Sequence, residues 1–325
     1  MGYDSTPADR FIRAHTSFII VGHKEPDGDC VASELAVASL IRALGKEATV
    51  HSAGPFDRPE ISSFEPQLSP VISDERRSGA AVIIVDCSTP DRTGALGARL
   101  LGLPSLVIDH HSTGEPFGDA RYVDATSPST TMLVSQLYSD MGIVPDAVTA
   151  RLLLFGLCTD TGFFRHLGAH GADTFHAVAG LVAQGTSTAE VYMMVYGERA
   201  LSTRKLLAEM LLRAESYCGD RLLLTWQTIS DRESLKAFQR GEDELYRLLQ
   251  TVKSNIIVAL IKEESSGAYS VGLRSTSEVD VGAVAGSFGG GGHKQASGFD
   301  INGSLESVKA RVLEALLPLV GGPCP

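Results

Sequence analysis

The sequence predicts an α/β protein with two units, the first built on a mostly parallel sheet flanked by helices. In the first half of the chain, short apolar runs alternate with helical patterns. A continuous helical pattern follows from about residue 190 to 216, and strand patterns around a helix return after it. Strand–helix alternation is typical of parallel sheets with helices on both faces. With 325 residues, 43% of them hydrophobic, the chain is long enough for two separate cores.

We expect the first unit to span residues 1–190, a helical linker to span 191–216, and a smaller α/β unit to span 217–325. In the first unit, strands are predicted over SFIIVGH, EATVHSAG, AAVIIVDC and PSLVIDHH, and helices over SELAVASLIRALG, TTMLVSQLYSDMG, AVTARLLLFGLCTD and GADTFHAVAGLVAQG. In the second unit, RLLLTWQTI, SNIIVALIKEE and AYSVGLRST read as strands, EDELYRLLQTV and VGAVAGSF as helical, and KQASG as a small-residue helix.

Charge and cysteine content narrow the partners and the compartment. The net charge of -11 argues against a protein that grips long duplex nucleic acid by its backbone. No apolar run reaches the length of a bilayer crossing, so no membrane partner is expected. The five cysteines are scattered without paired spacing, which favours a reduced, cytoplasmic protein.

Acids and histidines follow the predicted strands and one helix of the first unit. Alone, each aspartate would be read as a helix cap or turn former. Together, at the carboxyl edge of one sheet, uncompensated carboxylates would repel one another, so a cation is needed there. The residues concerned are His23, Asp27, Asp29, Asp86, Asp109, His110, His111 and Asp160.

The charge of this set predicts two divalent cations. Four carboxylates, those of Asp27, Asp29, Asp86 and Asp160, are balanced by two such ions, and His23 and His110 add neutral imidazoles. Oxygen and imidazole donors favour Mn²⁺ or Mg²⁺, with Co²⁺ and Zn²⁺ as alternatives. Cys30, Cys87 and Cys158 stand close to these aspartates, so a thiolate-rich zinc site is a second interpretation. We prefer the simpler one, in which each cysteine fills buried space.

The run GGGGHKQASG, residues 289–298, is either a connector or an anion-binding segment. It is not a Walker loop, because His293 separates the last glycine from Lys294. We expect its bare amides to form an anion-binding nest at the start of the helix predicted over KQASG.

The ordered motifs HKEPDGD, VD in VIIVDCS, DHHS and CTDTG resemble those of the DHH phosphoesterase superfamily, and GGGGHKQASG resembles the signature of the DHH-associated C-terminal domain. Together they run from His23 to Gly298. The resemblance implies an active-site cleft between two units. The chain has Ala32-Ser33 where many members have Gly-Ser, a departure that affects local packing more than chemistry.

The resemblance also implies roles for the residues. One Mn²⁺ would be held by His23, Asp27 and Asp86, and the second by Asp29, Asp86, His110 and Asp160. Asp109 would orient a histidine ring, and His111 would bind the scissile phosphate or protonate the leaving oxygen. Further substrate contacts are expected from Arg274, Gly290, Gly291, Gly292, His293, Arg165, Ser129 and Thr130. For Ser129 and Thr130, helix capping is the safer interpretation, and for Phe163 and Phe164 a core position is favoured over base stacking.

Among members of this superfamily, the chain looks like the compact nano-RNA hydrolases. The resemblance implies hydrolysis of short oligoribonucleotides to nucleoside monophosphates and dephosphorylation of 3′-phosphoadenosine-5′-phosphate. A water bridging the two cations would attack phosphorus in line. The alternatives are a phosphodiesterase for cyclic di-AMP or its linear product, and a non-catalytic nucleotide-binding protein. Pairing of the helical linker in a homodimer is a further hypothesis.

Overall fold

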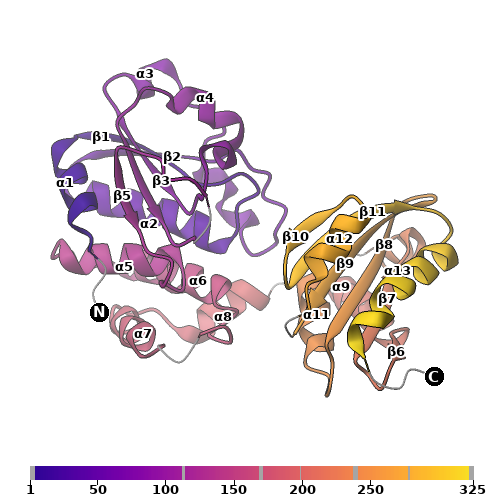
Figure 1. The fold of residues 1–325 in the computed structure, drawn as a ribbon. Helices are drawn as coiled ribbons and strands as arrows, with labels where there is room; N and C mark the ends of the chain where they lie inside the picture. Colours follow the sequence, from indigo (N-terminus) through magenta and orange to yellow (C-terminus); the bar gives the residue numbers. More distant parts are fainter. Residues whose placement is uncertain are drawn as a thin grey trace. The chain divides into compact units, whose positions relative to one another are not determined.

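The computed structural model describes residues 4–111, 114–167, 171–197, 199–236, 241–276 and 279–321. The chain divides into two compact units, Met1–Glu198 and Arg199–Pro325 (Figure 1). Each unit has its own sheet. The α/β class predicted from the sequence is therefore confirmed.

The first unit is a five-stranded sheet with the strand order β2-β1-β3-β4-β5, in which every pairing is parallel. Its helices and strands are α1 (Thr6–Ala14), β1 (Ser17–Val21), α2 (Gly28–Ala43), β2 (Glu47–His51), α3 (Asp74–Arg77), β3 (Ala81–Val85), α4 (Gly97–Leu100), β4 (Ser105–Asp109), β5 (Ala120–Val123), α5 (Thr130–Asp140), α6 (Ala147–Asp160), α7 (Ala172–Ala183) and α8 (Thr188–Tyr196). The short edge strand β5 has no counterpart in the sequence prediction.

Both faces of this sheet are buried, which explains why its strands read as unbroken apolar runs. Along β1, Phe18 and Ile20 join the core formed with α1, α2, α5 and α6. The alternate residues Ile19 and Val21 join a second cluster on the opposite face, with Leu96 and Leu100. This period of two, buried on both sides, is what a doubly covered parallel strand requires.

Three helices that lie near the predicted site begin at side-chain caps. The carboxylate of Asp27 accepts hydrogen bonds from the first amides of α2, Ser129 accepts one from Met132 in α5, and Asp146 accepts one from Thr149 in α6. Such caps satisfy amides that have no partner inside the helix. They fix the start of each helix, and with it the residues that the helix carries.

The second unit has a six-stranded sheet with the order β10-β11-β9-β8-β7-β6. Only the pairing of β7 with β8 is parallel among the described strands. Its elements are α9 (Leu201–Leu212), β6 (Glu215–Tyr217), β7 (Leu222–Gln227), α10 (Ile229–Leu235), α11 (Glu242–Gln250), β8 (Ile257–Ser265), β9 (Ala268–Ser275), α12 (Val281–Ser287), β10 (Gly291–His293), β11 (Ala296–Asn302) and α13 (Leu305–Val320).

The expectation of one continuous helical linker over 191–216 is wrong in detail. Helix α8 ends at Tyr196 and α9 begins at Leu201. The break follows from Gly197, whose backbone leaves the helical region and passes so close to Met193 that a Cβ would lie 2.3 Å from the Met193 carbonyl oxygen. Helix α9 then packs within the second unit through Leu206, Leu207 and Met210.

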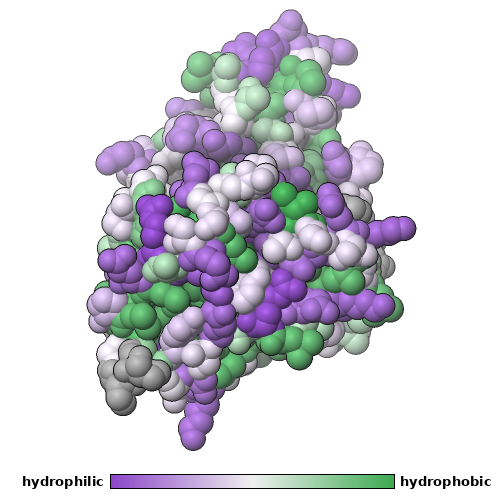
Figure 2. Space-filling model, turned by 90° about the vertical axis from the view of Figure 1, so that its right-hand side faces the viewer, coloured by the Kyte–Doolittle hydropathy of each residue, from purple (hydrophilic) through white to green (hydrophobic). Residues whose placement is uncertain are grey.

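Three of the cysteines, Cys30, Cys87 and Cys158, are free and buried. Cys218 is disulfide-bonded, so the expectation that all cysteines are reduced is not met. On the face shown in Figure 2, hydrophobic residues form small groups among hydrophilic ones. Among the helices that the structure describes, none is both long and apolar enough to cross a membrane.

Candidate metal centre

The predicted ligands lie near the point where the strand order of the first sheet reverses. Strand β2 lies on one side of β1, and the strands that follow, β3 to β5, lie on the other side. Ligands of open α/β sheets bind beyond the carboxyl ends of strands at such a point. His23 follows β1, Asp86 directly follows β3, and Asp109 is the last residue of β4.

Asp86 is the central carboxylate of the site. Its side chain is 2% exposed, and its Oδ2 lies 3.5 Å from Nε2 of His23 while its Oδ1 lies 3.6 Å from Nε2 of His110. These separations exceed those of ordinary N–H···O hydrogen bonds, and they leave room for a cation between the donor atoms. The backbone of Asp86 has φ 55°, an uncommon left-handed conformation that turns the chain at the end of β3. Asp86 thus turns one oxygen toward each of the two histidines, and its role as a bridging ligand stays a prediction.

The two histidines have the tautomer that metal binding needs. Nδ1 of His23 lies 2.8 Å from the carbonyl oxygen of Lys24, and Nδ1 of His110 lies 3.3 Å from that of Ser127. A carbonyl only accepts, so Nδ1 carries a proton, and Nε2 is the nitrogen that faces the carboxylates and is free to bind a metal once it is unprotonated. Burial alone would lower the pKa of His23, but the carboxylates of Asp86 and Asp27 outweigh it and the pKa is raised.

Asp29 is buried beside Asp86 and is held by the start of α5. Its Oδ2 accepts the amide of Thr130 at 2.6 Å, and its Oδ1 accepts the amide of Thr131 at 2.9 Å. Burial, followed by the charge of Asp86, raises the pKa of Asp29 well above its ordinary value. The helix amides thus orient the carboxylate without fully offsetting the cost of its charge, and a cation would stabilise the ionised form.

The remaining carboxylates are more open. Oδ1 of Asp27 accepts the amides of Asp29 and Cys30, and the Asp27 side chain is 29% exposed. Asp160, the last residue of α6, is 31% exposed, and its Oδ2 lies 3.5 Å from Nε2 of His110. Burial, together with the negative charge of Asp29, raises the pKa of Asp160 to about 8.

The assembled donors fit divalent cations. Asp29, His110 and Asp160 offer ligand atoms that all lie within 4.8 Å of one another. The same holds for Asp86 with His110 and His111. Carboxylate oxygens with imidazole nitrogens are the donor set of Mn²⁺, Mg²⁺ and related ions. The raised pKa values of Asp29 and Asp160 mean that a nearby cation would stabilise their ionised forms.

His111 lies beside this cluster and is held by Asp109. Its Nδ1 donates to Oδ1 of Asp109 over 2.7 Å, and that oxygen also accepts the amides of His110 and His111. The hydrogen bond to Asp109 raises the pKa of His111 to about 9 despite partial burial. His111 is 38% exposed, so its Nε2 edge remains available to another molecule. The arrangement agrees with the orienting role expected for Asp109.

Ser129 and Thr130 do not have the exposure that direct substrate contact would require. Both are fully buried. Ser129 caps α5 through the amide of Met132, and the Thr130 hydroxyl donates to Oδ1 of Asp86 at 2.9 Å. The capping interpretation fits Ser129, whereas Thr130 positions the carboxylate of Asp86, a predicted metal ligand.

The expectation of an anion-binding nest followed by a helix at GGGGHKQASG is wrong. KQASG forms a turn and the start of β11 rather than a helix. Gly289 and Gly290 use their amides to bond carbonyls of α12, those of Gly286 and Ala285, and so close the end of that helix. Gly291 and Gly292 form β10 with His293. Sequence composition permitted a small-residue helix, but pairing with β9 made this segment a strand.

Arg274 and His293 lie in one row across the second sheet. His293 pairs with Ala296, and Ala296 pairs with Arg274, so the two side chains share a face. His293 is exposed. The Arg274 guanidinium lies over the Tyr246 ring, 4.4 Å from its centroid, and donates to the carbonyl of Leu273. Stacking of this kind holds a guanidinium in a defined orientation.

The segment after Asp160 forms a tight aromatic turn. Phe163 and Phe164 both have positive φ, contact each other, and pack partly buried against the core. Phe163 also contacts Tyr192, and Phe164 contacts Phe175. Arg165 is exposed, with Nη2 at 3.0 Å from Nε2 of His166. Its role in substrate binding stays a prediction.

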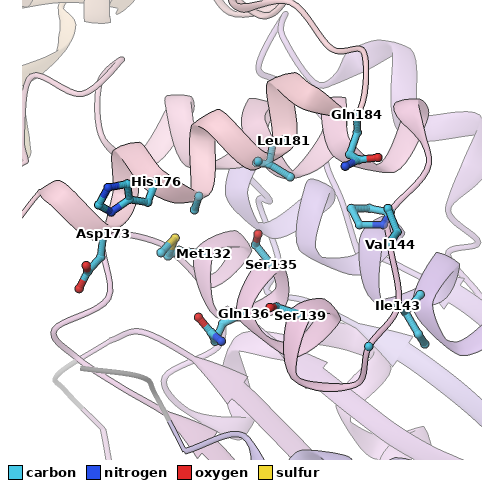
Figure 3. A pocket seen from close by; sticks show the side chains of 14 residues that line it. Met132, Ser135, Gln136, Ser139, Ile143, Val144, Asp173, His176, Leu181 and Gln184 are labelled. Carbon is cyan, nitrogen blue, oxygen red and sulfur yellow. The ribbon is translucent and has the colours of Figure 1, made fainter.

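A cavity of about 640 Å³ in the first unit is separate from this site. It lies between α5 and α7, with Met132, Ser135 and Gln136 on one side and His176, Leu181 and Gln184 on the other (Figure 3). None of the predicted metal ligands lines it.

Two residues make contacts that the preferred interpretations of the sequence did not include. Thr131 donates its hydroxyl to Asp29, and Cys30 places its sulfur beside His23 and Asp86. Both residues stand next to predicted site residues, and for Cys30 the thiolate-rich zinc site had been the second interpretation.

Buried carboxylates and imidazoles at the switch point of a parallel sheet fit a metal-dependent hydrolase. Residues 17–157 match the DHH family, N-terminal domain, and residues 243–320 match the DHHA1 domain. The chain carries both domains, and the resemblance drawn from its motifs is confirmed.

Three relatives place the chain further. It is 28% identical over 298 residues to the bifunctional oligoribonuclease and PAP phosphatase NrnA of Thermus thermophilus, covering 91% of this chain and 88% of the relative. It is 25% identical to the cyclic-di-AMP phosphodiesterase GdpP of Bacillus subtilis, covering 92% of this chain but 48% of that protein. An exopolyphosphatase-related protein from Bacteroides fragilis has the same fold, with a TM-score of 0.87 and 20% identity over 96% of each chain.

Proposed function

We propose that this protein hydrolyses short oligoribonucleotides to nucleoside monophosphates and dephosphorylates 3′-phosphoadenosine-5′-phosphate, using two divalent cations, Mn²⁺ first among them. One observation carries the proposal. The four carboxylates and two imidazoles grouped around Asp86 lie beside the Asp109–His111 pair. The near full-length similarity to an oligoribonuclease and PAP phosphatase supports the choice of substrate.

Different residues of the site have different roles in the proposed phosphoester hydrolysis. Divalent cations bound here would activate water and neutralise charge that develops on the phosphoryl group. Asp86, fixed by the Thr130 hydroxyl, holds its two oxygens toward the two histidine nitrogens. Such fixed ligands cost no reorganisation during the reaction.

His111 supplies the proton. Its Nδ1 proton is held by Asp109, so the imidazolium directs its Nε2 proton elsewhere. With a pKa of about 9, the ring carries that proton at neutral pH in the metal-free protein. We assign it to an oxygen of the scissile phosphate or to the leaving ribose 3′-oxygen.

The second unit supplies recognition in this proposal. His293 and Arg274 present two cationic or hydrogen-bonding groups on one face of its sheet. An arginine held by an aromatic ring suits a terminal phosphate. The net charge of -11 agrees with a short substrate rather than a long polymer. The free thiols of Cys30, Cys87 and Cys158 support a cytoplasmic location, whereas the disulfide of Cys218 does not.

Product analysis with purified full-length protein and Mn²⁺ tests the proposal. End-labelled RNAs of increasing length, the bisphosphate nucleotide and cyclic di-AMP would be compared under one set of conditions. We expect monophosphates from the shortest RNAs, phosphate from the bisphosphate nucleotide, and no turnover by Asp86→Ala. Preferential cleavage of cyclic di-AMP would replace the main substrate, in line with the GdpP similarity. Tight nucleotide binding without any product would identify a non-catalytic protein.

His293→Ala tests the role of the second unit. The expected result is a raised KM for dinucleotide with unchanged Mn²⁺ affinity, because His293 belongs to the second unit and the metal ligands to the first. His176→Ala is the matched control, since His176 lines the cavity of Figure 3. Equal effects of the two variants would remove His293 from the binding role.

A further inference from the structure

A buried thiol lies beside the first metal position, the one predicted at His23, Asp27 and Asp86. Cys30 lies in the first turn of α2 and is fully buried. Its Sγ, a ring nitrogen of His23 and a carboxylate oxygen of Asp86 all lie within 4.8 Å of one another. In a tetrahedral site with a Zn–S distance of about 2.3 Å and a Zn–N distance of about 2.0–2.1 Å, donor atoms are closer together than this limit. Small movements would therefore bring all three onto one ion.

The direction of the thiol is set by Gly22, between β1 and His23. A Cβ at this position would lie 2.2 Å from Sγ of Cys30. Only glycine lets the sulfur rest against this backbone and so reach the end of β1. The amide of Cys30 donates to Asp27, which ties the thiol to the same helical turn as a predicted ligand.

Glu34 is a second, independent feature beside the thiol that a nearby cation would stabilise. It lies one turn after Cys30 in α2 and is fully buried. Neither of its carboxyl oxygens has a hydrogen bond of normal geometry within the described part of the chain. A Cβ at Gly22 would lie 3.1 Å from Oε1 of Glu34, so the carboxyl faces the same glycine as the thiol. A buried carboxyl whose nearest donor is the Gly22 amide alone is costly to ionise unless positive charge is near.

We propose that Cys30 is a fourth donor at the first metal position, with His23, Asp27 and Asp86, and that this position prefers a borderline or soft divalent cation such as Zn²⁺ or Co²⁺. Binding exchanges the thiol proton, which is released to solvent, for the metal–sulfur bond. Thiolate donors favour such ions over Mn²⁺ and Mg²⁺.

The second position differs in its donors. Asp29, His110 and Asp160 form a set of oxygen and nitrogen atoms without sulfur among the described residues. That set suits Mn²⁺ or Mg²⁺. The two positions of the centre are thus chemically unequal, and a mixed pair of metals is the expected composition, which limits the Mn²⁺ of the proposed function to the second position. The inference rests on the metal centre of the proposed function but not on its substrate.

Cobalt spectroscopy of the metal-free, full-length protein tests this directly. The first equivalent of Co²⁺ is expected to produce the near-ultraviolet charge-transfer band of a cobalt–thiolate bond. Cys30→Ser and Cys30→Ala should lose that band while calorimetry still detects Co²⁺ binding. Cys87→Ser and Cys158→Ser are matched controls, since both residues are also free and buried, and both should keep it.

Competition between metals gives a second readout. Cys30→Ala should weaken Zn²⁺ binding by at least the roughly 10–100-fold that loss of a ligand's supporting partner costs, with a much smaller change for Mn²⁺. A band that survives in Cys30→Ser, or wild-type protein that binds Co²⁺ without any band, would overturn the inference. Should both Cys30 variants fail to fold, a wild-type band that disappears in the Cys87→Ser or Cys158→Ser protein would overturn it equally. Absence of RNA hydrolysis would count against the proposed function and leave the band unchanged.

Discussion

Asp29 accepts two hydrogen bonds from Thr131, one from the amide at 2.9 Å and one from the hydroxyl at 2.6 Å, both to Oδ1. The two residues are 102 positions apart in the chain. The hydroxyl therefore ties a predicted metal ligand on α2 to the start of α5. Partners of this kind fix the orientation of a ligand and tune its affinity.

Thr131→Val should weaken Mn²⁺ binding by about 10–100-fold, because the variant keeps the shape of the side chain but loses the hydroxyl. Thr131→Ser is the matched control and should bind like the wild type. Isothermal titration with Mn²⁺ gives both affinities. The positioning role fails if the valine and serine variants bind Mn²⁺ equally well.

Mn²⁺ binding at pH 7 should release protons from Asp160. In the metal-free protein the pKa of this carboxyl is raised to about 8, so its proton is still bound at pH 7. A metal ligand must be ionised, and so affinity should rise as pH increases toward 8 and fall in acid. Calorimetry in two buffers of different ionisation enthalpy measures the proton count. Asp160→Asn should release about one proton fewer, and an unchanged count would contradict the assignment.

Asp109→Asn should reduce kcat while leaving Mn²⁺ affinity close to that of the wild type. The carboxylate holds the Nδ1 proton of His111 at 2.7 Å, and an amide holds it less firmly. Loss of a general acid typically costs roughly 10²–10⁴-fold in rate. His111→Ala gives the full cost, and the double variant completes a cycle. If the pair works as a unit, Asp109→Asn adds little once His111 is gone, whereas full additivity would show independent roles.

The sequence predicted that the acids and histidines of the candidate metal centre lie together, because strand ends are readable. Apolar runs mark β1, β3 and β4, and the polar residues that follow them must meet at one sheet edge. It did not predict the contacts of Thr131 with Asp29, because these depend on how α5 approaches α2. For Cys30 the sequence favoured a buried filler over a zinc ligand, because the direction of its thiol depends on the empty space at Gly22.

Local composition misled the prediction where tertiary pairing decides the structure. The residues of KQASG are compatible with a helix, yet Ala296 and Gly298 pair with Arg274 and Gly272 of β9. Similarly, the apolar pattern from α8 into α9 continues across Gly197, where the backbone turns out of the helix. In the first place the deciding partner lies outside the local window, whereas in the second a single glycine interrupts an otherwise helical pattern.

Alanine substitutions at Gly290 and Gly291 should differ in their effect on stability, because the two glycines have different surroundings. At Gly290 a Cβ would lie 2.2 Å from the Gly298 carbonyl oxygen and 2.4 Å from the Phe299 Cβ, whereas at Gly291 no atom lies within 4 Å. Gly290→Ala should therefore destabilise the second unit by about 1–3 kcal/mol, the usual cost of overpacking. Gly291→Ala should stay within about 0.5 kcal/mol of the wild type.

Denaturant unfolding followed by the fluorescence of Trp226, the single tryptophan and part of β7, reports on the second unit. Equal unfolding midpoints for the two variants would contradict the close packing of Gly290 against β11. Because Gly291→Ala is expected to fold normally, its KM for dinucleotide separates packing from recognition. A raised KM with an unchanged midpoint would show that substrate approaches the backbone at Gly291, and an unchanged KM would limit this glycine run to a structural role.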